Sequence, residues 1–262
     1  MQRPFLRFAL PHAAKLRFAF LPGLGLLLAL GLAPAALAGE AKAPKAVVEL
    51  FTSQGCSSCP EADAFLADLS NREEVIALSL PVDYWDYLGW KDTLARPENS
   101  ERERAYAAAR GDGKVYTPQM VVNGGAAFVG SDRQAVAKAI AATKLPVPIQ
   151  IRKSGGKLEI EIGAGAAPEG RSVAVRFVTF RQKATVPIRG GENNGRTVTY
   201  RNVVKTSQPI GLWDGDPLTL LLPADQIMAG EDIGCAVLLQ VEEEKGPGAI
   251  LGAATVVASA AG

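Results

Sequence analysis

Two cysteines separated by two serines stand where a predicted strand ends and a predicted helix begins. Residues 46–51 form an apolar run typical of a buried strand, Cys56 and Cys59 follow it, and Pro60 suits the first turn of a helix. A helix N-terminus favours thiolate over thiol, and this spacing brings the two sulfurs within disulfide reach. The motif therefore predicts a redox-active pair in an α/β fold, with Cys56 as the more exposed, attacking thiolate and Cys59 as the resolving thiol.

The first 38 residues have the pattern of a secretory signal. Four basic residues and no acidic residue precede the uncharged run 18–38, which ends in Ala36-Leu37-Ala38. This pattern predicts export and cleavage after Ala38, and hence a periplasmic or secreted protein. The alternative is an uncleaved anchor, because a run of this length can span a bilayer. An exported chain would keep its cysteines in a compartment that permits disulfides.

Removal of residues 1–38 limits the chemistry that the chain can support. The 28 Lys and Arg residues fall to 24, because four lie in this segment, and they face 27 Asp and Glu residues, a formal charge of −3. His12 is the only histidine and leaves with the segment, which excludes Ser-His-Asp and Cys-His mechanisms. We expect no nucleic-acid partner, since the chain is not basic, and no membrane contact after cleavage.

The remaining chain divides into two parts with different sequence patterns. Residues 39–145 predict the order β-α-β-insert-β-β-α, with an inserted loop and helix at 83–114, whereas the alternation of residues 146–262 predicts a β-rich, sandwich-like domain. In the helix that begins at Pro60, Asp63 falls outside the apolar face. The strands are expected at 46–51, 75–82, 116–122, 126–129, 149–153, 158–162, 173–182, 196–205, 217–222, 234–241 and 249–257, and two further helices at 97–110 and 133–144.

Thr117-Pro118 begins the third predicted strand. In thioredoxin-type folds a cis-proline at this place lies beside the cysteine pair and keeps the backbone available to an extended substrate. The layout of residues 39–145 resembles such a fold, with Pro118 as the proline and Thr117 beside it. The alternative is that Pro118 is an ordinary trans turn residue.

Three segments together resemble a family of secreted bacterial proteins known as the domain of unknown function 1223 family. They are residues 49–60, 82–90 and 116–124, and the resemblance extends over essentially the whole exported chain. It implies a thioredoxin-like fold and assigns the cysteine pair to Cys56 and Cys59, but it implies no substrate. Leu80-Pro81 lies at about the point where we expect a histidine in this family, so an acid–base role there is absent here.

Two other regions carry candidate functional residues. Asp83, Trp85 and Trp90 of the aromatic loop are candidates, with Thr117, for a substrate groove, because Tyr and Trp make good peptide-contact surfaces. The alternatives are that both tryptophans pin the insertion to the core and that Asp83 caps a turn rather than accepting a proton from Cys59. The glycine-rich stretch 190–195 predicts a hairpin turn rather than a phosphate loop.

The third cysteine, Cys235, lies in an alternating strand pattern. It is expected to be an inert core thiol, with a regulatory or intermolecular partner role as the alternative.

These observations predict an exported thiol–disulfide oxidoreductase that acts on protein or peptide thiols and disulfides without an organic cofactor or a metal. One alternative is a thioredoxin-like peptide-binding module with a structural disulfide. Another is a Cu(I) carrier that uses Cys56 and Cys59, although the thioredoxin-like copper proteins that it would resemble also use a histidine. The motif is compatible with an oxidant, a reductant or an isomerase, and with any oligomeric state.

Overall fold

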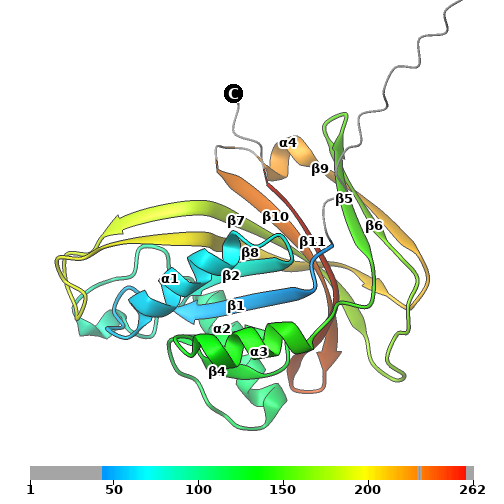
Figure 1. The fold of residues 1–262 in the computed structure, drawn as a ribbon. Coiled ribbons are helices and arrows are strands. Elements are labelled where there is room, and N and C mark those ends of the chain that lie inside the picture. The colour runs from blue at the N-terminus through cyan, green and yellow to red at the C-terminus, as the bar shows by residue number, and fades with distance from the viewer. Residues whose placement is uncertain (1–42, 229, 231, 258–262) are drawn as a thin grey trace, which may run out of the picture. The chain divides into compact units, whose positions relative to one another are not determined.

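A computed structural model describes residues 43–228, 230 and 232–257, all of which lie in one compact unit. The predicted signal segment 1–38 lies outside the described residues. The fold is mixed α/β, with a large sheet, a small sheet and four helices in the described part of the chain (Figure 1). The strands are β1 (Ala46–Thr52), β2 (Val75–Pro81), β3 (Gln119–Val122), β4 (Ala127–Val129), β5 (Ile149–Ser154), β6 (Lys157–Ile162), β7 (Val173–Pro187), β8 (Thr197–Trp213), β9 (Leu218–Pro223), β10 (Ile233–Glu243) and β11 (Gly246–Val257); the helices are α1 (Cys59–Ser70), α2 (Pro97–Arg110), α3 (Arg133–Ala142) and α4 (Ala224–Ile227), with a short 3-10 helix η1 (Asp86–Leu88).

The large sheet has the strand order β11-β10-β7-β8-β2-β1-β3-β4. β1 pairs in parallel with β2 and antiparallel with β3, and every residue of β1 and β2 is buried. Alternate residues of β1 enter two different cores, because Val48 and Leu50 pack with α1 and α3 whereas Val47 and Phe51 pack on the side of α2. Strands covered on both faces read as continuous apolar runs, which is why 46–51 and 75–82 stand out in the sequence.

The two segments predicted as separate domains share this large sheet. β8 pairs in parallel with β2 through Ser79 and Val203, so strands from both sides of residue 146 form one continuous sheet. β7 and β8 also run past the ends predicted for them and form a long antiparallel hairpin. The boundary at residue 146 therefore marks a change of local sequence pattern rather than a separation into two bodies. The sequence does not reveal this, because pairing between distant strands leaves no signal within either segment.

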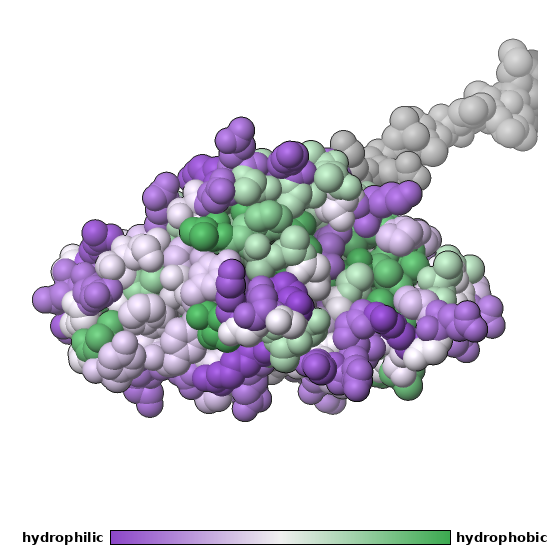
Figure 2. All heavy atoms as spheres, turned by 90° about the horizontal axis from the view of Figure 1, so that it is seen from below, coloured by the Kyte–Doolittle hydropathy of each residue, from purple (hydrophilic) through white to green (hydrophobic). Residues whose placement is uncertain are grey.

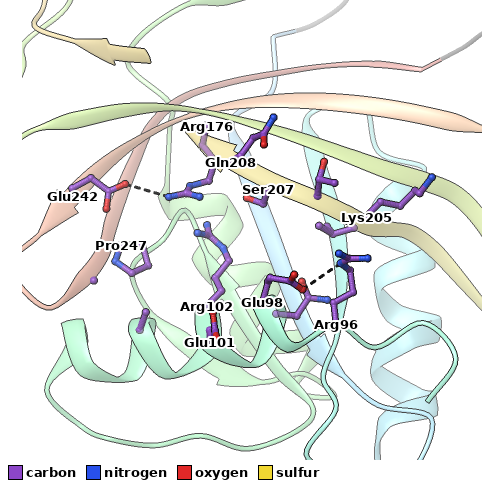
Figure 3. A pocket seen from close by; sticks show the side chains of 15 residues that line it. Arg96, Glu98, Glu101, Arg102, Arg176, Lys205, Ser207, Gln208, Glu242 and Pro247 are labelled. Carbon is purple, nitrogen blue, oxygen red and sulfur yellow. Dashed lines mark hydrogen bonds and ion pairs between the residues drawn. The ribbon is translucent and has the colours of Figure 1, made fainter. Parts of the chain in front are cut away.

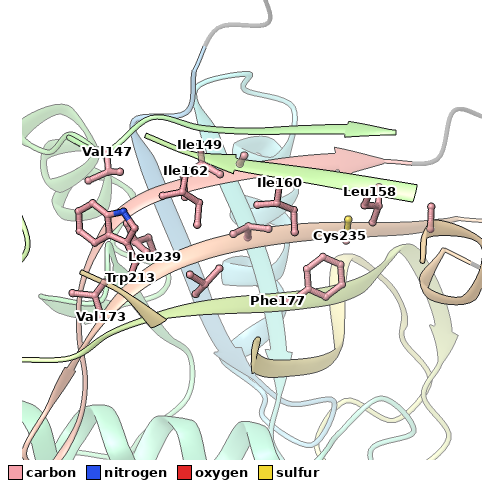
Figure 4. Packing of buried hydrophobic residues seen from close by; sticks show 14 of the residues in the cluster. Val147, Ile149, Leu158, Ile160, Ile162, Val173, Phe177, Trp213, Cys235 and Leu239 are labelled. Atoms are coloured by element: carbon pink, nitrogen blue, oxygen red, sulfur yellow. The ribbon is translucent and has the colours of Figure 1, made fainter. Parts of the chain in front are cut away.

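The three-stranded sheet β5-β6-β9 packs on β7, β10 and β11 across a third core (Figure 4). Ile160 and Ile162 of β6 pack here with Phe177 of β7 and Leu239 of β10. Cys235 belongs to the same core, is fully buried and is a free thiol. Burial raises the pKa of Cys235 to about 12, so the thiol stays protonated and unreactive near neutral pH.

The surface gives little indication of a docking face. Hydrophilic and hydrophobic residues are interspersed on the face seen in Figure 2. The large apolar side chains that are exposed come from different segments, and singly exposed apolar residues are common on proteins; they are Tyr87, Val115, Val129, Leu212, Leu221 and Val257. Among the described helices, none has the length and apolar character needed to cross a membrane.

Candidate functional site

Cys56 and Cys59 form a disulfide at the junction between β1 and α1, with 5.4 Å between their Cα atoms. α1 begins at Cys59, with Pro60 in its first turn, as the sequence predicts. The backbone N–H of Cys59 donates to the carbonyl of Cys56 at 3.2 Å, and the Sγ of Cys56 lies 3.4 Å from the hydroxyl of Ser58. The disulfide thus sits against the positive end of a helix dipole, where a thiolate would be stabilised.

Both cysteines are buried, so the greater exposure predicted for Cys56 amounts to a very small difference in the disulfide form. Cys56 is 1% exposed and Cys59 is 0% exposed, while Ser57 and Ser58 between them are exposed. The loop of the β7–β8 hairpin, residues 188–196, is far from the cysteines in sequence and packs on the cysteine loop. The glycine-rich stretch is a hairpin connection, as predicted, but it also closes over the cysteine loop.

Hydrogen bonds fasten the hairpin loop to the cysteine loop. The side-chain amide of Asn193 donates to the carbonyl of Cys56 at 2.8 Å and to the carbonyl of Gln54 at 3.0 Å, and Asn193 is 1% exposed. The carboxylate of Glu192 accepts from the backbone N–H of Ser57 at 3.1 Å. These three bonds hold the hairpin loop against the cysteine loop, and lifting the loop away requires all of them to break.

Replacing Asn193 with Ala should make the disulfide easier to reduce. The variant loses two hydrogen bonds, each worth about 1 kcal/mol, so the open form should become at least roughly tenfold more populated. We expect the rate of reduction by dithiothreitol to rise by about that factor, measured by trapping the freed thiols. Asn194→Ala is the matched control, because Asn194 is the exposed neighbour in the same loop. Equal rates for both variants would show that Asn193 does not hold the cover.

The aromatic loop of the insertion contacts both the cysteine loop and the proline loop. The indole N–H of Trp85 donates to the hydroxyl of Thr117 at 2.7 Å, and the indole N–H of Trp90 donates to the side-chain oxygen of Gln54 at 2.8 Å. Trp85 also lies against Gly55, where an added Cβ would stand 3.1 Å from the Cβ of Trp85. The two tryptophans therefore anchor the insertion, which is the structural alternative considered for them, and they border the site at the same time.

Pro118 lies beside the helix that carries Cys59. The Thr117–Pro118 bond is cis, and the carbonyl of Pro118 accepts from the N–H of Gly130 at 2.9 Å. A Cβ built on Gly130 would stand 2.9 Å from the Cβ of Pro118 and 3.0 Å from the Cβ of Ala62, so both residues pack on this glycine. Pro118 is thereby held next to the first turns of α1.

Asp83 faces α2 rather than the cysteines. One of its carboxylate oxygens accepts from the hydroxyl of Ser100 at 2.6 Å, and its N–H donates to the same hydroxyl at 3.2 Å. These two bonds tie the start of the insertion to the first turn of α2. The Asp83 carboxylate therefore serves the packing of the insertion on α2, which is neither the turn cap nor the proton acceptor considered for it.

Asp63 is the acidic residue that sequence reasoning missed. It stands four residues after Cys59 on α1, on the same side of the helix, and is 3% exposed. Its Oδ1 accepts from the hydroxyl of Thr52 at 2.8 Å, while its Oδ2 has no hydrogen-bond partner among the described residues. Burial raises the pKa of Asp63 to about 8, although the hydrogen bond from Thr52 lowers it. The nearby carboxylate of Asp92 also raises this pKa.

A second buried carboxyl group lies next to the proline loop. Glu103 of α2 accepts from the N–H of Tyr116 at 2.9 Å and from the hydroxyl of Tyr84 at 3.0 Å. Burial raises the pKa of Glu103 to about 7, although both of these bonds lower it. Within the described residues, no three His, Cys, Asp or Glu side chains gather as a metal site.

Known proteins resemble this chain in sequence or in fold. A family model described as "Protein of unknown function (DUF1223)" matches residues 47–240. The crystal structure of protein AGR_C_4864 from Agrobacterium tumefaciens is 39% identical, with a TM-score of 0.73 over 82% of this chain and 95% of that one. HBP35 of Porphyromonas gingivalis is 12% identical, with a TM-score of 0.58 over 82% of this chain and 75% of that one, which is a likeness of fold alone. None of the curated proteins matches the chain.

Proposed function

The chain belongs to the DUF1223 family of proteins of unknown function, and from this starting point we propose that it is an exported thiol–disulfide oxidoreductase. The observation that carries the proposal is the Cys56–Cys59 disulfide at the N-terminus of α1, with the buried Asp63 one turn further along the same helix. We also propose a thioredoxin-like arrangement for this region, which is supported by the order of β1, α1, β2, β3, β4 and α3 and by the position of Pro118 beside α1.

The reaction is exchange through a mixed disulfide. In one direction a substrate thiolate attacks the sulfur of Cys56, the Cys56–Cys59 bond breaks, and Cys59 leaves as a thiolate. A second substrate thiolate then attacks the substrate sulfur of the mixed disulfide and releases Cys56, so the substrate is oxidised to a disulfide and the pair is reduced. The reverse sequence begins with attack by the Cys56 thiolate and ends when Cys59 displaces the substrate.

In this scheme Asp63 donates a proton to the sulfur of Cys59 or accepts one from it. With a pKa of about 8 it carries a proton at neutral pH and can donate it as Cys59 leaves. In the reverse direction, the Asp63 carboxylate accepts that proton and generates the resolving thiolate. The role first considered for Asp83 therefore passes to Asp63, because Asp83 is bonded to Ser100.

The substrates of this proposal are protein or peptide thiols and disulfides in a periplasmic or secreted setting. The pattern of residues 1–38 supports export, and neither a metal nor an organic cofactor is needed, because the electrons reside on two sulfurs. Thr117, Trp85 and Trp90 border the path to the cysteines and are the candidates for contact with a substrate chain once the hairpin loop lifts.

One observation favours the alternative of a binding module with a structural disulfide. Cys56 and Cys59 are 1% and 0% exposed, and a buried disulfide resists exchange until its cover opens. The reduction potential separates the two functions. A catalytic pair should lie between about −270 and −120 mV, and a structural disulfide below about −300 mV.

The potential can be measured by equilibrating the purified protein with glutathione redox buffers and following the Cys56–Cys59 bond. We also expect Cys59→Ser to accumulate one glutathione on Cys56 after incubation with oxidised glutathione, because the resolving thiol is lost. Cys56→Ser is the matched variant and should accumulate far less, since Cys59 is proposed as the resolving rather than the attacking thiol. A potential below −300 mV together with no mixed disulfide on Cys56 would reject the oxidoreductase.

A further inference from the structure

A hollow of about 600 Å³ lies between α2 and strands β7, β8, β10 and β11 (Figure 3). Its volume is in the range of small-molecule sites. Seven of the fifteen lining residues are charged, four basic and three acidic; they are Arg96, Arg102, Arg176, Lys205, Glu98, Glu101 and Glu242. None of these residues belongs to the cysteine site.

Two hydrogen-bond donors in this lining lack a partner. The Nε of Arg176 and the hydroxyl of Ser207 are buried atoms with no hydrogen-bond partner in the described part of the chain. Ser207 pairs with Val178 and Arg176 pairs with Pro209, so the two side chains stand at diagonal positions on the same face of the β7–β8 hairpin. Buried donors are rarely left unpaired in native proteins, and this pair therefore points to a ligand that accepts hydrogen bonds.

The charge at this position is also incompletely neutralised. Arg102 is bonded to Glu49 at 2.7 Å, whereas Arg176 has only a 3.4 Å contact with Glu242. Figure 3 shows Arg176 and Arg102 entering the hollow from opposite walls, β7 and α2. Burial lowers the pKa of Arg176, and the cation of Arg102 lowers it further, as expected for a guanidinium that has too little negative charge beside it.

We propose that this hollow binds a carboxylate group, which accepts from the Nε of Arg176 and from the hydroxyl of Ser207. Guanidinium groups recognise carboxylates through paired N–H bonds. The acidic side chains Glu98, Glu101 and Glu242 border the hollow and disfavour a doubly charged phosphate, so a singly charged group fits best.

The carboxylate has two possible sources, a small organic acid or an extended peptide. Residues 204–208 of β8 line the hollow, and β8 pairs with β2 only at Val203 while pairing with β7 along its other edge. A peptide carboxylate at Arg176 would therefore place its backbone along an open strand edge, as in strand addition.

Titration calorimetry of the purified full chain tests this site with three probes: acetate, acetyl-tetra-alanine with a free C-terminal acid, and its C-terminal amide. Both acids should bind saturably, and the amide should not. Tighter binding of the peptide acid than of acetate would identify the peptide source, and equal binding the small acid. Arg176→Gln should weaken binding of the acids at least tenfold.

Arg181→Gln is the matched control, because it removes the same charge from an exposed position on the same strand. It should change the affinity less than twofold. Ser207→Ala keeps all charges and should weaken binding about threefold. This variant tests the site independently if the Arg176 variant does not fold. The proposal fails if the amide binds as well as the acid, if neither acid binds, or if Arg176→Gln and Arg181→Gln have equal effects.

Discussion

Replacing Glu49 with Gln should lower the free energy of unfolding by about 3–5 kcal/mol, because the change leaves a buried cation without its bonded carboxylate. Arg102 donates from Nε to one oxygen of Glu49 at 2.7 Å and from Nη2 to the other at 3.0 Å. The Arg102 and Glu49 side chains are 9% and 3% exposed, so water can replace the lost partner only in part. Urea unfolding followed by circular dichroism measures the loss.

The remaining bonds of this cluster explain why it matters to the whole fold. The hydroxyl of Tyr106 donates to Glu49 at 2.5 Å, and Gln240 accepts from Arg102 at 2.9 Å and donates to Tyr106 at 2.8 Å. The cluster thus joins α2 and β1 to β10. α2 and β1 come from the first of the two segments predicted as separate domains, and β10 comes from the second. Unfolding of one segment would expose the polar groups of the other.

Glu161→Gln provides the matched control for this prediction. Glu161 pairs with Arg152 at 2.7 Å on β5 and β6, but these side chains are 40% and 53% exposed. Exposed ion pairs contribute about 0–1 kcal/mol, so the control should be nearly neutral. If Glu49→Gln cost no more than Glu161→Gln, the buried cluster would not be a determinant of stability.

The local elements could be predicted because their signals are local. α2 begins at Pro97 and ends at Arg110, as predicted, since a proline occupies the first turn and Gly111 follows with a φ of 73°. The placement of Cys56 and Cys59 between β1 and α1 followed in the same way. Neither signal depends on a distant part of the chain.

The cover of the site could not be predicted because it depends on distant contacts. Asn193 is separated from Cys56 by 137 positions, and an asparagine in a glycine-rich loop is typical of any turn. The sequence pattern of α1 predicts Asp63 outside the apolar face of the helix, yet Asp63 is buried. The cause is that α1 also packs on β8, a strand from the second half of the chain. A pattern within one helix cannot reveal a strand that arrives from elsewhere.

Asp63→Asn should make the free energy of unfolding less dependent on pH. The variant should gain most free energy of unfolding, relative to the wild type, at alkaline pH. Between pH 4 and 8 the folded chain keeps a proton on Asp63 that the unfolded chain has released, because burial raises the pKa of Asp63 from 3.8 to about 8. The free energy of unfolding of the wild type therefore falls as the pH rises through this interval. Each pKa unit corresponds to about 1.4 kcal/mol, so the advantage of the variant should grow by several kcal/mol, about 5 at most.

Urea unfolding at pH 4, 6 and 8 measures this slope, and the slope is a better readout than the stability at one pH. The amide of the variant lacks a partner where Oδ2 now lies, but that cost is the same at every pH. Glu103, with a pKa raised to about 7 by burial, titrates in both proteins and cancels in the comparison. Asp68→Asn, an exposed position on the same helix, should leave the slope unchanged.

The same variant separates the fold from the proposed chemistry. If Asp63 supplies the proton of Cys59, Asp63→Asn should slow reduction of the disulfide at pH 7 and remove a titration near pH 8 from its rate profile. A changed stability slope with an unchanged rate profile would leave Asp63 as a buried acid without a role in exchange. Parallel slopes for wild type and Asp63→Asn would contradict the burial argument itself, because an ordinary carboxyl group contributes no such dependence between pH 4 and 8.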